Sequence, residues 1–336
     1  MKKADLARHS QRPFDGLTPE LILNSAEAAI GLRSLGTYWA LNSVENRVLE
    51  IPFENNLSFV AKFYRPGRWE PETIREEHQF LALLEKQEIP VNAPFSSKQK
   101  LKNWGSTLFE TADGQYLFSL FPKLRGRIKD EFSASDFEIL GRLLGRMHLM
   151  GETFPSQKRR TLEPETWGYD SLDFLQDINP NPSPMAQRYF QVAGECVDQI
   201  QNLWGDVEPR MLSIHGDCHI GNLLWDEGAP VFLDFDDLVK GPVIQDLWMI
   251  LGDYKDSNKE NWDRTIAAYR EFREFPEKEI RLIPALRALR MIHFSKWIAE
   301  RWEDPSFPSL WPNFGSDPWW QEEIQALSEI TDRLFD

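Results

Sequence analysis

The sequence predicts an α+β protein of two lobes, a small antiparallel β-rich lobe with one main helix and a larger, mostly helical lobe. Short runs of β-favouring residues are concentrated before Pro122, and apolar runs of helical period and length dominate after it. A strand-like insert at 211–235 interrupts the helical part. We therefore expect one domain over 1–122 and a second over 123–336, with a ligand-binding cleft at their joint.

The first lobe is expected to begin with a helix over 18–34, because Thr18 is a suitable N-cap and Pro19 fits the first turn. A three-stranded antiparallel meander should follow over 38–43, 46–53 and 57–63, with a turn at 54–56. The main helix is expected over 71–87. Two more strands, 104–111 and 116–120, flank the favoured hairpin turn Asp113-Gly114.

The second lobe is predicted to be helical over 134–150, 184–203, 262–272 and 284–301, and a further helix opens near 245–248. Its two cysteines, Cys196 and Cys218, form no CxxC pair, so no disulfide framework is expected.

The composition excludes several classes of partner. The chain has 336 residues and a formal net charge of −15, which repels nucleic acid and anionic lipid. It contains no uncharged apolar run of about 18 residues that could span a membrane, and its first residues lack the apolar segment of a signal peptide. We therefore expect a cytoplasmic protein that binds neither nucleic acid nor membrane.

The residues that carry chemistry lie in one loop and the strand after it. Asp217 follows His215-Gly216 and precedes Asn222, and the apolar run 230–233 ends in Asp234. Phosphoryl transfer needs a carboxylate for the proton of the attacking hydroxyl and hard oxygen ligands that hold Mg²⁺ against the phosphates. The spacing is that of a kinase catalytic loop and its metal-binding aspartate. It predicts ATP and Mg²⁺ as cofactors, catalytic Asp217 and Asp234, and the metal ligands Asn222 and Asp234.

The same loop allows other interpretations. A turn rich in capping residues would use similar residue types, and His215 is expected to support the loop rather than act as the base. A zinc site formed by His215, Cys218 and His219 is conceivable, but the spacing matches no common zinc pattern. Cys218 is expected to fill a turn rather than to be a reactive thiol.

The first lobe supplies the candidate nucleotide-binding residues. Lys62 lies within the apolar strand 59–63, where a lysine is costly to bury without a partner, and it is expected to bind the phosphates. Glu76 and Glu77 lie on the next helix, and we prefer Glu77 as the partner because it shares a helix face with apolar residues. The first hairpin has no glycine-rich loop, so Ser43 at its tip is the candidate for the phosphates.

Two further expectations concern neighbouring segments. The adenine should lie against 120–124, between the two lobes. Asp246 near the start of a helix could hydrogen-bond back to the catalytic loop, or it could act as a helix-terminal acid that favours the dipole.

These motifs together resemble the bacterial stress response kinase A family (the YihE/RdoA type), within the aminoglycoside/choline/homoserine kinase-like group. The resemblance covers most of residues 38–310 in order, and it rests on 42–47, 60–66, 76–80, 215–222, 234–237, 241–249 and 301–308. It implies a protein kinase-like fold, a monomer and Mg-ATP-dependent serine/threonine kinase activity in stress response. It also implies Asp217 as proton acceptor, Asn222 and Asp234 as Mg²⁺ ligands and Ser43 as an ATP-site residue. Departures from eukaryotic kinases, including the absent Ala-Pro-Glu motif, put control by activation-loop phosphorylation in doubt.

Two other functions are open at this point. A small-molecule kinase acting on an amino alcohol, homoserine or an aminosugar would use the same catalytic residues, and the acidity of the chain is compatible with a cationic substrate. A nucleotide-binding scaffold is the third possibility, and the presence of Lys62, Asp217, Asn222 and Asp234 argues against it. The acceptor is therefore a hydroxyl of a protein or of a small molecule.

Overall fold

The computed structural model describes residues 12–99 and 104–334, which form two compact units. The first unit extends to Lys129 and also includes Ser156–Lys158 and Gly221–Asp236. The second consists of Asp130–Pro155, Arg159–Ile220 and the chain from Asp237 onward. This division differs from the expected single boundary at residue 122, because two later segments return to the first unit.

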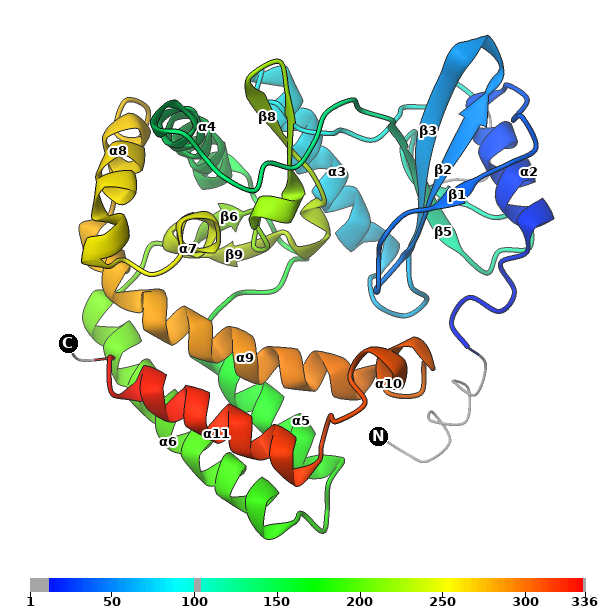
Figure 1. Cartoon of the computed structure of the whole chain (residues 1–336). Coiled ribbons are helices and arrows are strands. Elements are labelled where there is room, and N and C mark those ends of the chain that lie inside the picture. The colour runs from blue at the N-terminus through cyan, green and yellow to red at the C-terminus, as the bar shows by residue number, and fades with distance from the viewer. Residues whose placement is uncertain (1–11, 100–103, 335–336) are drawn as a thin grey trace. The chain divides into compact units, whose positions relative to one another are not determined.

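The first unit is built on a five-stranded antiparallel sheet in the order β1-β2-β3-β5-β4 (Figure 1). Alternate residues of β2 are buried, as the two-residue period of a half-buried strand requires. The predicted meander is confirmed, with a 3-10 turn, Glu54–Asn56, between its second and third strands. The strands are β1 Trp39–Ala40, β2 Arg47–Phe53, β3 Leu57–Phe63, β4 Phe109–Glu110 and β5 Leu117–Pro122.

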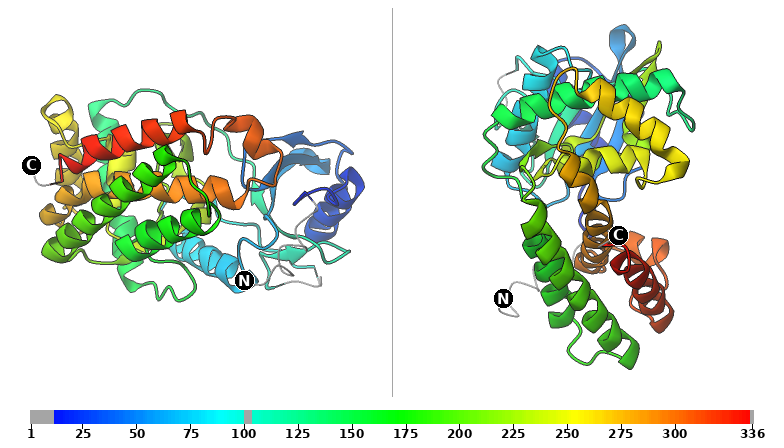
Figure 2. Two further views of the ribbon diagram at one scale, coloured as in Figure 1. Left: turned by 90° about the horizontal axis from the view of Figure 1, so that it is seen from below. Right: turned by 90° about the vertical axis from the view of Figure 1, so that its left-hand side faces the viewer.

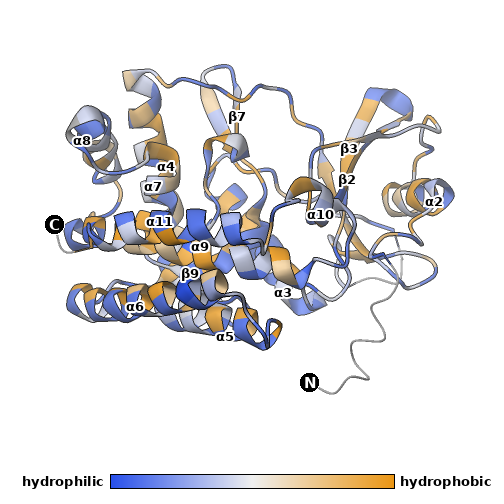
Figure 3. Ribbon diagram, turned by 60° about the horizontal axis from the view of Figure 1, so that its bottom comes forward, coloured by the Kyte–Doolittle hydropathy of each residue, from blue (hydrophilic) through white to orange (hydrophobic). Residues whose placement is uncertain are grey.

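Helix α2 (Pro19–Ile30) packs its buried residues into the same hydrophobic cluster as the sheet. Figure 3 shows hydrophobic bands on α2 and along β2 and β3. The predicted cap is confirmed, since the Thr18 hydroxyl accepts the backbone N–H of Leu21 at 3.2 Å. The helix ends before residue 34 because Gly31 takes a left-handed conformation with φ of 80°.

Helix α3 (Pro71–Lys86) agrees with the predicted main helix of the first unit. Its buried face contains Ile74, Phe80, Leu81 and Leu84, and Glu77 is buried on the same helix. The spacing of these residues is that of an amphipathic helix with one face in the core.

The hairpin of β7 (Leu223–Asp226) and β8 (Ala229–Phe232) belongs to the first unit through backbone hydrogen bonds. The N–H of Phe232 donates to the carbonyl of Pro90 at 2.9 Å, and Arg127 and Trp225 exchange two bonds of 3.0 and 2.8 Å. These pairings join segments far apart in the sequence, and they explain why residues 221–236 leave the predicted second domain.

The second unit is mostly helical, with α11 lying alongside α6 and α9 (Figure 1, Figure 2). The sequence predicted α4, α6, α8 and α9 and the start of α7, but it did not predict α5, α10 and α11. The helices are α4 Ala134–Thr153, α5 Asp170–Asp177, α6 Pro184–Val207, α7 Ile244–Leu251, α8 Lys259–Tyr269, α9 Ile283–Glu300, α10 Ser306–Leu310 and α11 Asp317–Thr331.

A short antiparallel ribbon, β6 (Leu212–Ile214) with β9 (Val239–Gly241), positions the loop that follows β6 in the second unit. Helix α4 packs closely on α8 at Gly141, which has no side chain. A Cβ at this position would lie 2.3 Å from the carbonyl oxygen of Thr265. Within residues 12–99 and 104–334, no helix combines the length and the apolar character needed to cross a membrane.

Candidate active site

Asn222 and Asp234 leave the β7–β8 hairpin at its open end. Leu223 pairs with Phe232, and the N–H of Leu233 donates to the carbonyl of Asn222 at 2.9 Å, so Asp234 follows directly after the last paired residue. Asp234 has a φ of 56°, a left-handed conformation that costs a non-glycine residue roughly 1–2 kcal/mol. Its side chain is 55% exposed, so the carboxylate remains accessible to a ligand.

The ammonium of Lys62 is held by two carboxylates from the end of this hairpin. Its Nζ lies 2.7 Å from Oδ1 of Asp234 and 3.4 Å from Oδ1 of Asp236, and its side chain is only 7% exposed. Burial opposes the charge, but Asp234, Asp236 and Glu77 outweigh it and hold the pKa of Lys62 well above its ordinary value. Lys62 is therefore a permanent buried cation beside Asp234.

The two glutamates that the sequence proposed as partners of Lys62 have different surroundings. Both oxygens of Glu76 accept backbone N–H groups, from Gln157 and, at 2.7 Å, from Lys158. Glu76 thus anchors the segment 156–158 to helix α3. Glu77 is 1% exposed, and its negative charge contributes to the raised pKa of Lys62.

The loop 41–46 between β1 and β2 contains Ser43. The Ser43 hydroxyl accepts the N–H of Asn46 at 3.3 Å, which closes the turn. The Asn46 side chain donates to Oδ2 of Asp236 at 3.1 Å and accepts the N–H of Arg65 at 3.1 Å. This loop is therefore tied to the carboxylate that also contacts Lys62.

Asp236, Asn46 and Arg68 form a supporting group to which the sequence assigned no role. Arg68 Nη1 lies 2.5 Å from Oδ2 of Asp236, and Asp236 itself is buried. A buried carboxylate needs cations or hydrogen-bond donors around it, and Asp236 has both, so it can hold Lys62 in place. The only sequence signal was the position of Asp236 two residues after Asp234.

In the second unit, the loop after β6 is held by Asp246 on helix α7. Its Oδ2 accepts the N–H of His215 and its Oδ1 accepts the N–H of Gly216, both at 2.9 Å. The His148 ring donates to the same carboxylate at 3.1 Å. Asp246 is fully buried, and of its two expected roles the structure shows the hydrogen bonds to the loop after β6.

Gly216 allows this loop to turn tightly. It has a φ of 85°, and a Cβ at this position would lie 2.3 Å from the carbonyl oxygen of Asp237. The next residue, Asp217, donates its N–H to Nδ1 of the buried His215 at 3.3 Å. His215 thus supports the loop, and burial raises the pKa of the Cys218 thiol well above its usual value, so Cys218 stays a protonated, buried residue.

Asp217 has one partner that sequence reasoning missed. Nη2 of Arg290, on helix α9, lies 2.8 Å from its Oδ1, and Nε2 of His219 lies 3.5 Å from its Oδ2. The Asp217 side chain is 22% exposed and that of Arg290 is 39% exposed, so both remain accessible. Arg290 is an ordinary charged position in a helix, and nothing local in the sequence singles it out.

The chain is similar to known phosphotransferases and kinases. Residues 40–290 match the phosphotransferase enzyme family. A stress response kinase A of Salmonella choleraesuis (strain SC-B67) is 35% identical over 323 residues, which cover 96% of this chain and 95% of that protein. The serine/threonine protein kinase RdoA of Salmonella typhimurium (strain LT2) is 36% identical over 324 residues, with the same two coverages.

Solved structures extend the likeness to the fold. The structure of amicoumacin kinase hAmiN in complex with AMP-PNP, Ca²⁺ and Ami is 20% identical in sequence and superposes with a TM-score of 0.71. The match covers 99% of this chain and 96% of that one. A microcompartment-associated aminopropanol kinase is 17% identical, with a TM-score of 0.64 over 94% of this chain and 95% of that one. The predicted kinase-like fold is confirmed, and the protein is a phosphotransferase acting on a hydroxyl group. The chain belongs to the phosphotransferase enzyme family and, within it, to the stress response kinase A family.

Proposed function

We propose that this protein is a serine/threonine kinase that transfers the γ-phosphate of Mg-ATP and acts in a stress response. The observation that carries the proposal is the ion pair of the buried Lys62 with the accessible Asp234, next to Asn222 at the open end of one hairpin. Relatives named stress response kinase A and serine/threonine protein kinase RdoA, each matched over almost its whole length, support the choice of acceptor and process.

The donor set at the hairpin end fits Mg²⁺. Asn222 provides an amide oxygen and Asp234 a half-exposed carboxylate, which are the hard oxygen ligands that Mg²⁺ prefers. When bound, Mg²⁺ would neutralise phosphate charge that develops during transfer. We propose Asn222 and Asp234 as its ligands.

Three residues of the first unit are proposed to bind the nucleotide. Lys62 supplies a fixed positive charge for the phosphates, and Glu77 helps to keep that charge in place. Ser43 lies in a turn whose neighbour Asn46 is bound to Asp236, and its hydroxyl and backbone would meet the phosphates. Glu76 is not proposed for this role, because both of its oxygens already accept backbone N–H groups.

Asp217 is proposed as the proton acceptor. The acceptor O–H bond breaks and its proton passes to Asp217, while the oxygen forms a bond to the γ-phosphorus and the bond from that phosphorus to the ADP oxygen breaks. The hydrogen bonds from His215 and Gly216 to Asp246 hold the loop in a fixed conformation. A fixed base is worth more than a mobile one because its orientation is set before the reaction.

A small-molecule kinase is the second candidate. Structures of the same fold include an aminopropanol kinase, and the proposed catalytic residues would serve either acceptor. A panel of acceptors incubated with γ-labelled ATP separates the two: generic protein substrates, this protein itself, homoserine, choline and aminoglycosides. Label on protein serine or threonine supports the proposal, and label confined to the small molecules refutes it. ATP binding without transfer to any acceptor would favour a nucleotide-binding scaffold.

The matched control is an exposed aspartate. Asp217→Asn should slow label transfer about 1,000-fold, whereas Asp226→Asn, the same substitution at the exposed end of β7, should leave it unchanged. Equal loss in both variants would indicate a general effect on folding and would remove the support for Asp217.

A further inference from the structure

Helix α9 presents basic residues next to Asp217, although the chain as a whole is strongly acidic. Arg287 and Arg290 lie three positions apart, which places them on one side of the helix, and both side chains are 39% exposed. Arg301 follows directly after the helix, where its guanidinium lies 5.1 Å from the Trp297 ring and its Nη1 lies 3.0 Å from Oε2 of Glu300. Helix α9 therefore brings the guanidinium of Arg290 directly to Asp217, with that of Arg287 one turn earlier on the helix.

His293 lies one turn beyond Arg290 on α9, and the charged groups that lower its pKa are cations. Its ring stacks on Trp167 with centroids 4.5 Å apart, and its Nδ1 lies 3.2 Å from the Ser171 hydroxyl. Burial lowers the pKa of His293 to about 3, together with four neighbouring positive charges: Lys296, Arg160, Arg301 and Arg290. The charged groups that lower the pKa of this ring are all cations, and Arg290 is one of them.

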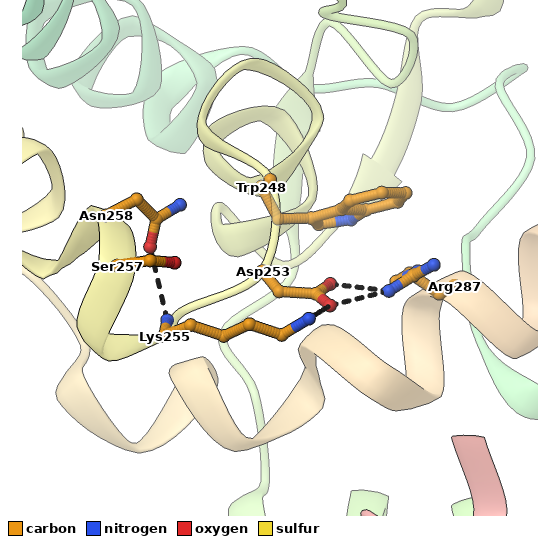
Figure 4. Close-up of a pocket in the computed structure, with 7 residues that line it drawn as sticks. Trp248, Asp253, Lys255, Ser257, Asn258 and Arg287 are labelled. Atoms are coloured by element: carbon orange, nitrogen blue, oxygen red, sulfur yellow. Dashed lines mark hydrogen bonds and ion pairs between the residues drawn. The ribbon is translucent and has the colours of Figure 1, made fainter. Parts of the chain in front are cut away.

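A pocket of about 430 Å³ lies beside Arg287 in the second unit (Figure 4). Among the described residues that line it, Asp253 is the only residue with a carboxylate. That carboxylate forms ion pairs with several cations. Arg287 Nη1 lies 2.7 Å from both Asp253 oxygens, Lys255 Nζ lies 3.0 Å from one of them, and Arg333 lies 3.9 Å away. Although burial opposes ionisation, Lys255 and Arg287 lower the pKa of Asp253. This carboxylate is therefore ionised and paired with both cations.

The pocket wall is connected to the catalytic loop by hydrogen bonds. Trp248 lines the pocket, and its Nε1 donates to Oε1 of Gln245 at 2.9 Å. The amide of Gln245 donates in turn to the carbonyl of Gly216 at 3.0 Å. A ligand in this pocket would therefore lie against the same helix that holds the residue preceding Asp217.

We propose that the acceptor is anionic: the hydroxyl that reaches Asp217 carries a carboxylate or phosphate close by, which Arg287 and Arg290 bind. This inference rests on the proposed transfer to a hydroxyl and names the class of acceptor. Guanidinium groups bind carboxylate and phosphate in bidentate fashion, and they repel the ammonium groups of amino alcohols and aminosugars. For a protein acceptor, the substrate is a serine or threonine flanked by acidic or phosphorylated residues.

The test uses peptides of equal length with one serine flanked by glutamate, glutamine or lysine. We expect kcat/KM with full-length protein and Mg-ATP to be highest for the glutamate peptide, lowest for the lysine peptide, and to fall for the glutamate peptide as salt is added. A glutamate peptide with alanine in place of serine should inhibit competitively. Equal or reversed preference among the three peptides overturns the inference.

Variants of Arg287 test the assignment to this helix. Arg287→Gln should raise KM for the glutamate peptide about tenfold or more with a smaller change in kcat, because one charge-assisted contact is lost. Arg287→Glu should move the preference toward the lysine peptide. Arg281→Gln, an exposed arginine before α9, is the matched control and should change neither parameter. An unchanged preference in both Arg287 variants would contradict the proposal.

Small acceptors test whether the anionic group belongs to a small molecule or to a protein. A hydroxy acid and an amino alcohol of similar size are offered under the same conditions, and transfer to the hydroxy acid alone supports an anionic acceptor of small-molecule type. Transfer to the amino alcohol alone overturns the inference while leaving phosphotransferase activity intact. No transfer to any acceptor would overturn the proposed function, and this inference with it.

Discussion

Asp246→Asn tests whether one buried carboxylate holds the catalytic loop in place. The wild-type side chain accepts the N–H groups of His215 and Gly216 and a ring nitrogen of His148, and it is fully buried. An amide group has one acceptor oxygen instead of two. In the variant, one of the loop N–H groups must therefore face another donor in a site without water access.

The size of the expected loss of stability in Asp246→Asn follows from those contacts. Losing a charge-assisted hydrogen bond and leaving a buried donor unsatisfied should lower the free energy of unfolding by about 3 kcal/mol. His148 does not compensate, because burial lowers its pKa and leaves it a neutral ring at neutral pH. A displaced loop also moves Asp217, and an error of about 1 Å in a catalytic group costs on the order of 100-fold in rate.

Urea denaturation and steady-state transfer kinetics measure the two effects. We expect reduced stability and a reduced kcat, with KM for ATP nearly unchanged, because the proposed nucleotide residues Lys62 and Ser43 belong to the first unit. Asp206→Asn, at an exposed position of α6, is the matched control. Stability within about 0.5 kcal/mol of wild type together with an unchanged kcat would refute the bracing role.

Three further predictions concern other contacts. Lys62→Met should reduce transfer about 100-fold or more, because the fixed charge beside Asp234 is lost; an unchanged rate at saturating ATP would contradict its role. Gly216→Ala should destabilise the protein by about 2 kcal/mol or more, because of its positive φ and the clash with a carbonyl oxygen, while Gly194→Ala, in open space on α6, should stabilise it by about 0.5–1 kcal/mol in the same denaturation assay. Burial raises the pKa of Glu323 to about 7, so its folded form prefers the proton and stability is lost as pH rises from about 4.5 to 7, by up to about 3 kcal/mol. Glu323→Gln should remove this loss in chemical denaturation across that pH window, and an unchanged pH dependence would show that the carboxyl is not the cause.

The fold could be predicted where the signal is local. The cap at Thr18, the meander and the helix over 71–87 follow from capping and periodicity within a few residues, and the structure confirms them. The assignment of 221–236 to the first unit depends on backbone pairing with segments near residues 90 and 127, which no local pattern encodes. Helix α11 was not predicted, although Ser316 and Asp317-Pro318 at its start are typical of a helix N-terminus.

Some residues of the candidate site could likewise be predicted from local sequence, and others could not. Asp217, Asn222 and Asp234 could be proposed because a loop and the strand after it contain all three at a recognisable spacing. Asp236 and Arg290 could not be assigned, because their roles depend on contacts across long sequence separations. Arg290 meets Asp217 only after α9 has folded against the loop, and the residues around a lone helical arginine do not indicate which carboxylate it will contact.

The most direct test of the account separates nucleotide binding from transfer. ATP affinity is measured calorimetrically with and without Mg²⁺, and label transfer is measured on the same preparations of wild type, Asp217→Asn and Asp234→Asn. We predict that Asp217→Asn binds Mg-ATP like wild type but transfers about 1,000-fold more slowly, whereas Asp234→Asn loses the effect of Mg²⁺ on ATP binding. Transfer by Asp217→Asn at the wild-type rate would contradict the central claim that Asp217 is the proton acceptor.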